Sequence, residues 1–258
     1  MILNGKAYSN VLEKDTSISI VVPDKYESNY KVVYLLHPLT GSNTSWLYNS
    51  KVTEYSNKYN VLIVMPDCDR SFYVNMVHGL RYYDYISNEL PGIINATYNV
   101  SSNKEDIAII GASMGGYGAL RTALNNPDKY GFAGGIAPAL LYFEEELNRR
   151  IDNKKITDKM YGVQMIKDYY NCFGEDLRYD VSNDLVALSD NVASLDIKPR
   201  VFITCGKNDA IIKYVSRFDE EMKHKDIDYT GFITEGIHDW KFFDLGLKKA
   251  LEAFVNNQ

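Results

Sequence analysis

The chain has 258 residues, of which 45% are hydrophobic and 24% are charged, so it can bury one sizeable core. Its net charge of -6 argues against nucleic-acid and anionic-membrane partners, which require a basic patch. No apolar run approaches the ~18 residues that a membrane span needs. We therefore expect a protein that acts on a small, neutral ligand.

The N-terminus and the cysteines indicate the cellular compartment of the protein. The first seven residues lack the charged and apolar regions of a secretory signal. The three cysteines, Cys68, Cys172 and Cys205, are odd in number and widely spaced, which suits a reducing compartment and provides no metal cluster. We expect a cytoplasmic protein without a metal or cofactor, and the sequence leaves open whether it forms a homo-oligomer.

Strand and helix signals alternate along the chain, which predicts an α/β fold with a mainly parallel central sheet flanked by helices. No internal repeat or linker interrupts residues 1–258, so we expect a single domain. Pro91 should kink or split the helix that contains it. The expected strands are 17–22, 32–36, 61–65, 107–110, 132–136, 199–205 and 229–234, and the expected helices are 47–59, 83–98, 117–124 and the segment from 239.

The stretch from about 140 to 194 breaks this alternation, because it is long, charged and rich in aromatic residues. We predict a partly helical cap insertion over the strand ends, whose apolar side chains shape the substrate pocket. The alternative is that these side chains only pack the cap onto the core. They are Tyr142, Phe143, Met160, Tyr161, Met165, Tyr169, Tyr170 and Phe173.

The pentad Gly111-Ala-Ser113-Met-Gly115 follows an apolar strand signal and precedes a helix signal. This arrangement fits a nucleophile elbow, in which a serine occupies a strained strand-to-helix turn with its hydroxyl exposed. Glycine on either side removes the Cβ atoms that would collide. A glycine turn with an uninvolved serine is the alternative, and the flanking strand and helix argue against it. Ser113 is therefore the candidate nucleophile.

A serine hydroxyl needs a base, and the base must follow it in the chain order of this fold. Two of the four histidines, His224 and His238, follow Ser113. His224 lies in a charged stretch typical of a solvated helix end. His238 lies in a loop after a strand signal, where folds present reactive side chains. We therefore predict that His238 is the base.

The acid that orients the base is predicted by the same reasoning. Asp209 follows the strand signal at 199–205 and precedes His238 by one strand. Reactive groups gather at the carboxyl ends of strands in open α/β sheets. Asp239 is adjacent to His238, so its side chain should point elsewhere. Four other aspartates lack a preceding strand and are expected to be solvated: Asp180, Asp184, Asp190 and Asp196.

Ester chemistry also needs backbone amides that bind the oxyanion. One should be the amide of Met114, directly after the nucleophile, and the other should come from the loop after strand 32–36. Pro38 has no N–H and cannot donate, so Leu39 is the predicted donor. The alternative is that this loop is only a turn. Substrate-binding residues are left unassigned, although Trp46, Trp240 and the loop 70–79 are candidates for the pocket wall.

Together these segments resemble the esterase D group of α/β-hydrolases, and the tributyrin-esterase branch in particular. The resemblance runs from about residue 30 to 243. It implies an α/β-hydrolase fold and a serine carboxylesterase that hydrolyses short acyl esters without a cofactor. It assigns Ser113, Asp209 and His238 to the catalytic triad and Leu39 and Met114 to the oxyanion hole. The matching segments are 35–46, 64–67, 82–86, 111–118 and 236–240.

Two departures from the family pattern affect the predicted function. Pro38 stands where the family usually has glycine, which puts the shape of the oxyanion loop in doubt. Gly41 stands where S-formylglutathione hydrolases typically carry cysteine. This departure argues against a thioester substrate. The alternatives are a thioesterase of that type, an acyltransferase, and an inactive hydrolase fold that serves as a binding protein, and the presence of Ser113, Asp209 and His238 argues against the last.

Overall fold

The computed structural model describes residues 1–25, 29–153, 159, 162–177 and 179–256. Eight strands in this part of the chain form one sheet in the order β1-β2-β4-β3-β5-β6-β7-β8. The β1–β2 and β2–β4 pairs are antiparallel, and all the following pairs are parallel. The strands are β1 (Ile2–Ser9), β2 (Lys14–Val21), β3 (Lys31–Leu36), β4 (Val61–Pro66), β5 (Ile107–Ala112), β6 (Phe132–Ile136), β7 (Arg200–Gly206) and β8 (Tyr229–Thr234).

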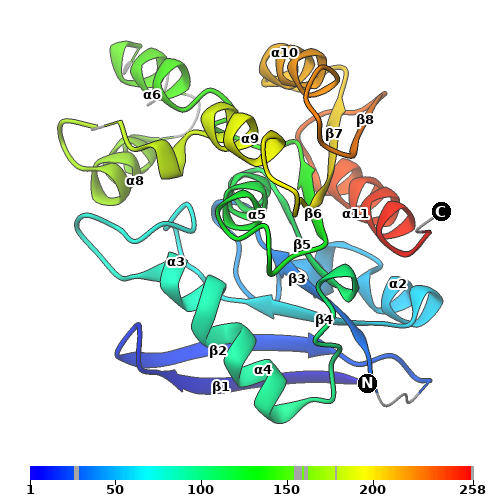
Figure 1. The fold of residues 1–258 in the computed structure, drawn as a ribbon. Helices are drawn as coiled ribbons and strands as arrows, with labels where there is room; N and C mark the ends of the chain where they lie inside the picture. The colour runs from blue at the N-terminus through cyan, green and yellow to red at the C-terminus, as the bar shows by residue number, and fades with distance from the viewer. Residues whose placement is uncertain (26–28, 154–158, 160–161, 178, 257–258) are drawn as a thin grey trace.

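Helices cover both faces of the sheet (Figure 1). Helices α2 and α11 contact each other on one face, and α5 and α9 lie on the other. The helices are α1 (Ser45–Asn49), α2 (Val52–Tyr59), α3 (Tyr82–Asp84), α4 (Leu90–Thr97), α5 (Met114–Asn125), α6 (Phe143–Asp152), α8 (Val163–Phe173), α9 (Leu185–Ala193), α10 (Ile212–Met222) and α11 (Trp240–Val255). The fold is that of the α/β-hydrolases, as the sequence predicts.

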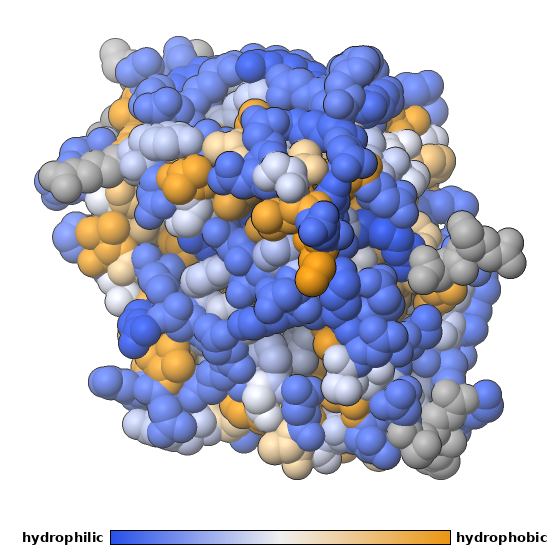
Figure 2. Space-filling view, viewed as in Figure 1, coloured by the Kyte–Doolittle hydropathy of each residue, from blue (hydrophilic) through white to orange (hydrophobic). Residues whose placement is uncertain are grey.

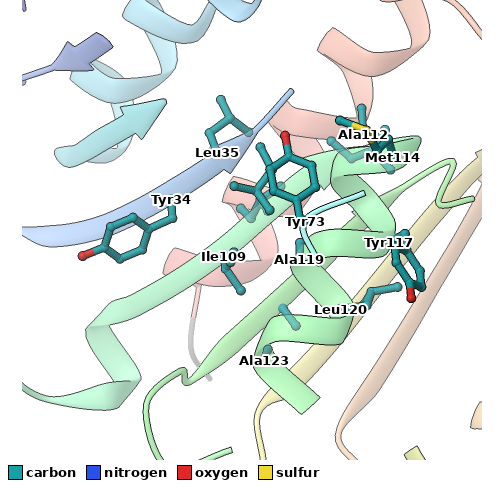
Figure 3. Close-up of a cluster of buried hydrophobic side chains, with 14 of the residues drawn as sticks. Tyr34, Leu35, Tyr73, Ile109, Ala112, Met114, Tyr117, Ala119, Leu120 and Ala123 are labelled. Carbon is teal, nitrogen blue, oxygen red and sulfur yellow. The ribbon is translucent and has the colours of Figure 1, made fainter. Parts of the chain in front are cut away.

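The core lies between the sheet and these helices. The central strands are buried on both faces, which explains why they read as continuous apolar runs in the sequence. Helix α5 carries Ala119 and Ala123 on the side toward Ile109 of β5 (Figure 3), and Leu120 lies against Gly135 of β6. The small residues let the helix lie close to the sheet, and this closeness holds the start of α5 at the end of β5.

The element boundaries differ from the predictions where burial is low or geometry is irregular. The strands at 132–136 and 229–234 match their predicted ranges. Strand β1 has no counterpart among the predictions, because it is an edge strand with mostly exposed residues and little apolar pattern. The helix expected at 47–59 is divided into α1 and α2.

The helix expected at 83–98 is continuous but not uniform. A π-helical turn (Tyr85–Glu89) separates α3 from α4, and Pro91 lies in the first turn of α4. Proline is tolerated there because the first amides of a helix have no internal acceptor. The helical conformation therefore continues through residues 82–97, and the predicted split at Pro91 is not seen; the helix changes only to a π-helical turn just before the proline.

The segment 140–194 contains α6, α8, a 3₁₀ turn (Val181–Asn183) and α9. Of the aromatic residues named in the prediction, Tyr142, Phe143, Tyr169 and Phe173 are buried, and Tyr170 is partly buried against the core. The rings of Phe143 and Phe173 lie 4.9 Å apart, and those of Phe72 and Tyr169 lie 5.2 Å apart. Met160 and Tyr161 lie outside the described residues. The packing alternative therefore holds for the described aromatic residues that the prediction named.

The surface shown in Figure 2 is largely hydrophilic, with apolar residues scattered among polar ones. None of the helices in the described ranges combines the length and the apolar composition that crossing a membrane would require.

Candidate active site

Ser113 lies at the turn between β5 and α5 with φ 54° and ψ -114°. A non-glycine residue in this region costs on the order of 1–3 kcal/mol, so its surroundings must hold it in place. They do so through two backbone hydrogen bonds. The Ser113 amide donates to Ile136 O at 2.9 Å, and the Ala139 amide donates to Ser113 O at 3.1 Å. The backbone of Ser113 thus has the geometry expected of a nucleophile elbow.

The flanking glycines permit close backbone contacts at this turn. A Cβ atom on Gly111 would lie 2.3 Å from Gly115 O. A Cβ atom on Gly115 would lie 2.5 Å from Leu36 O and 2.7 Å from His37 O. At both positions the colliding atoms belong to the backbone, so a side chain could be accommodated only if the backbone moved. Close packing therefore requires glycine at these positions.

Two hydrogen bonds connect the side chains of Ser113, His238 and Asp209. His238 Nε2 lies 2.9 Å from Ser113 Oγ, and His238 Nδ1 lies 2.7 Å from Asp209 Oδ2. Ser113 follows β5, Asp209 follows β7, and His238 follows β8. Parallel strands place their carboxyl ends along one edge of the sheet, which brings these residues together.

Asp209 is fully enclosed, whereas about a third of the His238 side chain is exposed. The second carboxylate oxygen, Asp209 Oδ1, accepts the Ile211 amide at 3.0 Å. This contact fixes the orientation of the carboxylate. An ionised Asp209 accepts the Nδ1 proton of His238, so the lone pair of Nε2 faces Ser113.

The competing candidates have other roles in the structure. Asp239 caps the N-terminus of α11 by accepting the Phe242 amide, and Asp184 caps α9. His224 is exposed after the end of α10, as expected of a solvated position.

The two predicted oxyanion donors line the same cavity as Ser113. Met114 is the first residue of α5, and an α-helix leaves its first amides without internal acceptors. Within the described part of the chain, the Leu39 amide donates no hydrogen bond. Both amides are therefore available to a ligand oxygen.

The loop that carries Leu39 is held by several hydrogen bonds. Pro38 O accepts the Gly41 amide at 2.9 Å, which closes a tight turn. Tyr73 Oη donates to His37 O at 2.8 Å from the neighbouring segment. Thr40 has φ 70°, consistent with that turn. Pro38 thus fits this loop, with its carbonyl as the acceptor that closes it.

His37 was not among the predicted site residues, yet it supports this loop. The Cys68 amide donates to His37 Nε2 at 3.0 Å, so this nitrogen must be unprotonated. Nδ1 therefore carries the proton and donates it to Pro38 O at 2.9 Å. Burial lowers the pKa of His37, because the charged imidazolium would lose its hydration. The sequence did contain a signal for a role of His37, because this histidine directly follows the buried strand β3.

Two cavities meet at Ser113, and Leu39, Met165 and His238 line both. The smaller cavity has a volume of about 230 Å³ and the larger one about 540 Å³. Phe72, Met114, Ala139, Arg150 and Ile211 are among the residues that line only the smaller cavity. The larger cavity is also lined by Thr40, Asn49, Arg70, Asp239, Trp240 and Phe243.

These linings revise the predictions about the pocket wall. Of the described cap residues named in advance, only Met165 lines the cavities, and the charged Arg150 lines the smaller one beside it. Trp240 borders the larger cavity. Trp46 is buried and does not line the cavity, and its ring centroid lies 5.1 Å from that of Trp240. The loop 70–79 contributes Arg70 and Phe72. Sequence alone could not distinguish pocket-lining cap residues from buried ones, because both kinds lie on the same helices.

The fold and the Ser113 geometry define an α/β-hydrolase with the arrangement of a serine hydrolase. The family described as putative esterase matches residues 9–254, and the chain belongs to this family of serine ester hydrolases. A relative from Caldicellulosiruptor saccharolyticus described as an acetyl esterase is 28% identical, and the alignment covers 95% of this chain and 94% of that one.

Solved structures show the same fold. FphF, a fluorophosphonate-binding serine hydrolase from Staphylococcus aureus, superposes with a TM-score of 0.86 at 23% identity, covering 100% of this chain and 99% of FphF. An S-formylglutathione hydrolase from the same organism superposes with a TM-score of 0.83 at 24% identity, and the alignment covers 99% of each chain. A ferulic acid esterase from Anaeromyces mucronatus gives 0.68 at 20% identity, covering 98% of this chain and 89% of that one.

Proposed function

We propose that this protein is a serine carboxylesterase that hydrolyses short-chain acyl esters through an acyl-enzyme on Ser113. One observation carries the proposal: the hydrogen-bonded series Asp209–His238–Ser113 lies beside a cavity that Leu39 and Met114 also line. This is the arrangement that acyl transfer to a serine requires.

The proposed reaction has two steps. His238 Nε2 removes the proton of Ser113 as Oγ attacks the ester carbonyl, and the amides of Leu39 and Met114 bind the oxyanion. The imidazolium then protonates the departing alcohol. Asp209 holds the Nδ1 tautomer and stabilises the imidazolium. Water activated by His238 releases the acid, and the partial exposure of His238 gives that water access.

The unequal cavities support a preference for short acyl groups. We assign the acyl group to the smaller cavity, which Met114 and Leu39 border together with apolar side chains. The alcohol part occupies the larger cavity, beside Trp240 and Phe243. His238 lies between the two, where it can protonate the leaving oxygen.

The test combines one substitution with a panel of esters. Ser113→Ala should lower kcat for p-nitrophenyl acetate by about a thousandfold or more and abolish labelling by a fluorophosphonate probe. Its far-ultraviolet circular dichroism and its melting temperature should show that it still folds. In the wild-type protein, acetyl and butyryl esters should react faster than octanoyl esters. Full activity of the Ser113 variant would refute the assignment.

The same panel separates the rival thioesterase. An acetyl thioester and an acetyl ester with leaving groups of similar size should be compared, and we expect the ester to give at least an equal kcat/KM. Gly41, in place of the cysteine typical of S-formylglutathione hydrolases, supports this preference.

The motifs also support a place in the esterase D group near the tributyrin esterases. Three free, buried cysteines support a reducing, cytoplasmic location, which cell fractionation would test.

A further inference from the structure

Arg70 lines the larger cavity together with Ser113 and His238, and the proposed reaction gives it no role. It follows β4 in a loop at the carboxyl ends of the strands. Its side chain is 29% exposed, so a ligand in the cavity can reach it. Asp168 of the cap helix α8 is its ion-pair partner.

The contacts of Arg70 leave one edge of its guanidinium unused. Nε and Nη2 both donate to Asp168 Oδ2, at 2.8 and 2.6 Å. A guanidinium has five N–H groups, so these two bonds leave both hydrogens of Nη1 and one of Nη2. Within the described ranges of the chain, Nη1 has no hydrogen-bond acceptor.

The orientation of Arg70 is fixed before any ligand binds. Asp168 is buried, with 3% of its side chain exposed, and its other oxygen accepts Gln164 Nε2 at 3.0 Å. The backbone of Arg70 is held too, because its amide donates to Asp69 Oδ1 at 2.8 Å. A donor held in this way loses little side-chain entropy when it binds an acceptor.

The charges around the cavity favour a neutral acceptor over an anion. Asp168 compensates the charge of Arg70, and Asp239 lines the same cavity. Thr40 and Asn49 add neutral polar groups at the rim, and Trp240 and Phe243 form an apolar wall. A hydroxyl group suits this setting, because it accepts one hydrogen bond and can donate another.

We propose that Arg70 is a specificity-determining residue that donates a hydrogen bond to a hydroxyl oxygen on the alcohol part of the substrate. This inference rests on the proposed esterase function and narrows its substrates to esters of alcohols that carry further hydroxyl groups.

The experiment compares glycerol monoacetate with propyl acetate, which has the same carbon chain without the free hydroxyls. Acetate release gives kcat/KM for each ester, and fluorophosphonate titration gives the concentration of active sites. The wild-type protein should favour glycerol monoacetate at least tenfold, the effect expected from a hydrogen bond to a charged donor.

Arg70→Lys should reduce that ratio at least fivefold, because lysine keeps a charge for Asp168 but lacks the unused guanidinium edge. The double variant Arg70→Met with Asp168→Asn removes the ion pair without leaving a buried charge, and it should reduce the ratio as well. Arg81→Lys is the matched control. Arg81 is exposed, pairs with Asp84 and lines neither cavity, so the ratio should not change.

A loss of positioning alone would slow both esters together, so only a change in the ratio supports the proposal. Equal kcat/KM values for the two esters in the wild-type protein would overturn it, as would an unchanged ratio in Arg70→Lys. If p-nitrophenyl acetate and the fluorophosphonate probe both fail to react, the esterase proposal falls and this inference falls with it. If both react and the ratio is one, only the role of Arg70 is refuted.

Discussion

Individual residues in this site are held by contacts that leave little freedom. Ser113 keeps a strained backbone because β6 supplies an acceptor for its amide. Asp209 keeps its orientation because both of its oxygens accept hydrogen bonds. His37 keeps one tautomer because an amide donates to one ring nitrogen and a carbonyl accepts from the other. Each group is thus oriented before any ligand binds, as the proposed esterase reaction requires.

His37 leads to a prediction about pH at this scale. Its pKa is lowered by burial in the folded protein, so the unfolded chain binds the proton first as the pH falls below ~6.5. The free energy of unfolding should therefore decrease as the pH falls from this value towards the folded pKa. The contribution of one group is at most about 1.4 kcal/mol per pH unit.

Urea denaturation at several pH values between about 7 and 5 measures this effect. His37→Gln should be less stable near pH 7, by about 1–3 kcal/mol, because it disturbs two buried hydrogen bonds. The free energy of unfolding of this variant should also change less with pH than that of the wild-type protein. The carboxylates contribute equally to the pH dependence of the two proteins, so the difference reports on His37. Identical pH slopes would show that His37 does not titrate on unfolding.

At the scale of elements, the site depends on how closely α5 approaches β3 and the loop after it. Gly115 lies against the carbonyls of Leu36 and His37, and Gly118 lies against the ring of Tyr73. Tyr73 in turn donates to His37 O. The packing of one helix therefore positions both predicted oxyanion donors, one at its own start and one in the facing loop.

A pair of glycine substitutions tests this dependence. Gly115→Ala should lower the free energy of unfolding by about 2 kcal/mol or more and reduce esterase activity, because its Cβ would collide with backbone oxygens. Gly92→Ala in α4 is the matched control, since no atom lies within 4 Å of its added Cβ. It should raise stability by about 0.5–1 kcal/mol, because alanine favours the helix. Denaturant titration and p-nitrophenyl acetate hydrolysis measure both effects, and similar results for the two variants would contradict this account.

At the scale of the whole molecule, the sheet collects groups from distant parts of the chain at one edge. Helices α6 and α8 contribute Arg150 and Met165 to the cavity that Ser113 also lines. The same dense packing encloses the three cysteines, Cys68, Cys172 and Cys205. Burial raises the pKa of all three thiols.

These thiols report on the integrity of the fold. In the native protein near pH ~8, a maleimide should label them at least about a hundredfold more slowly than an exposed thiol, because burial limits both access and thiolate formation. In denaturant, three equivalents should react quickly. Mass spectrometry of the labelled protein counts the modified residues. Rapid labelling of the native protein would show that the packing around these cysteines is looser than described.

Much of the fold could be predicted from the sequence because its central strands are buried on both faces. Such strands appear as short apolar runs, so β3 to β7 were placed within a few residues. The edge strand β8 has no buried residue, yet it also matches its predicted range. The exposed edge strand β1 has no such pattern and was missed. Ser113, His238 and Asp209 could be nominated because each follows a strand signal in the required chain order. His37 had a usable signal, because it directly follows a buried strand. Arg70 and Arg150 lie in segments that could be nominated only as a whole, because nothing local distinguishes them from the other polar residues there.

The sequence by itself determined the order of the strands and helices, the strained turn at Ser113 and the residues available as base and acid. Only the tertiary structure decided which of them touch: the 2.9 Å and 2.7 Å contacts of His238 join residues separated by 125 and 29 positions. It also decided the size of the two cavities and the residues that line them. Local pattern records the propensity and burial of each segment, whereas distances between segments arise only when the sheet and cap pack together.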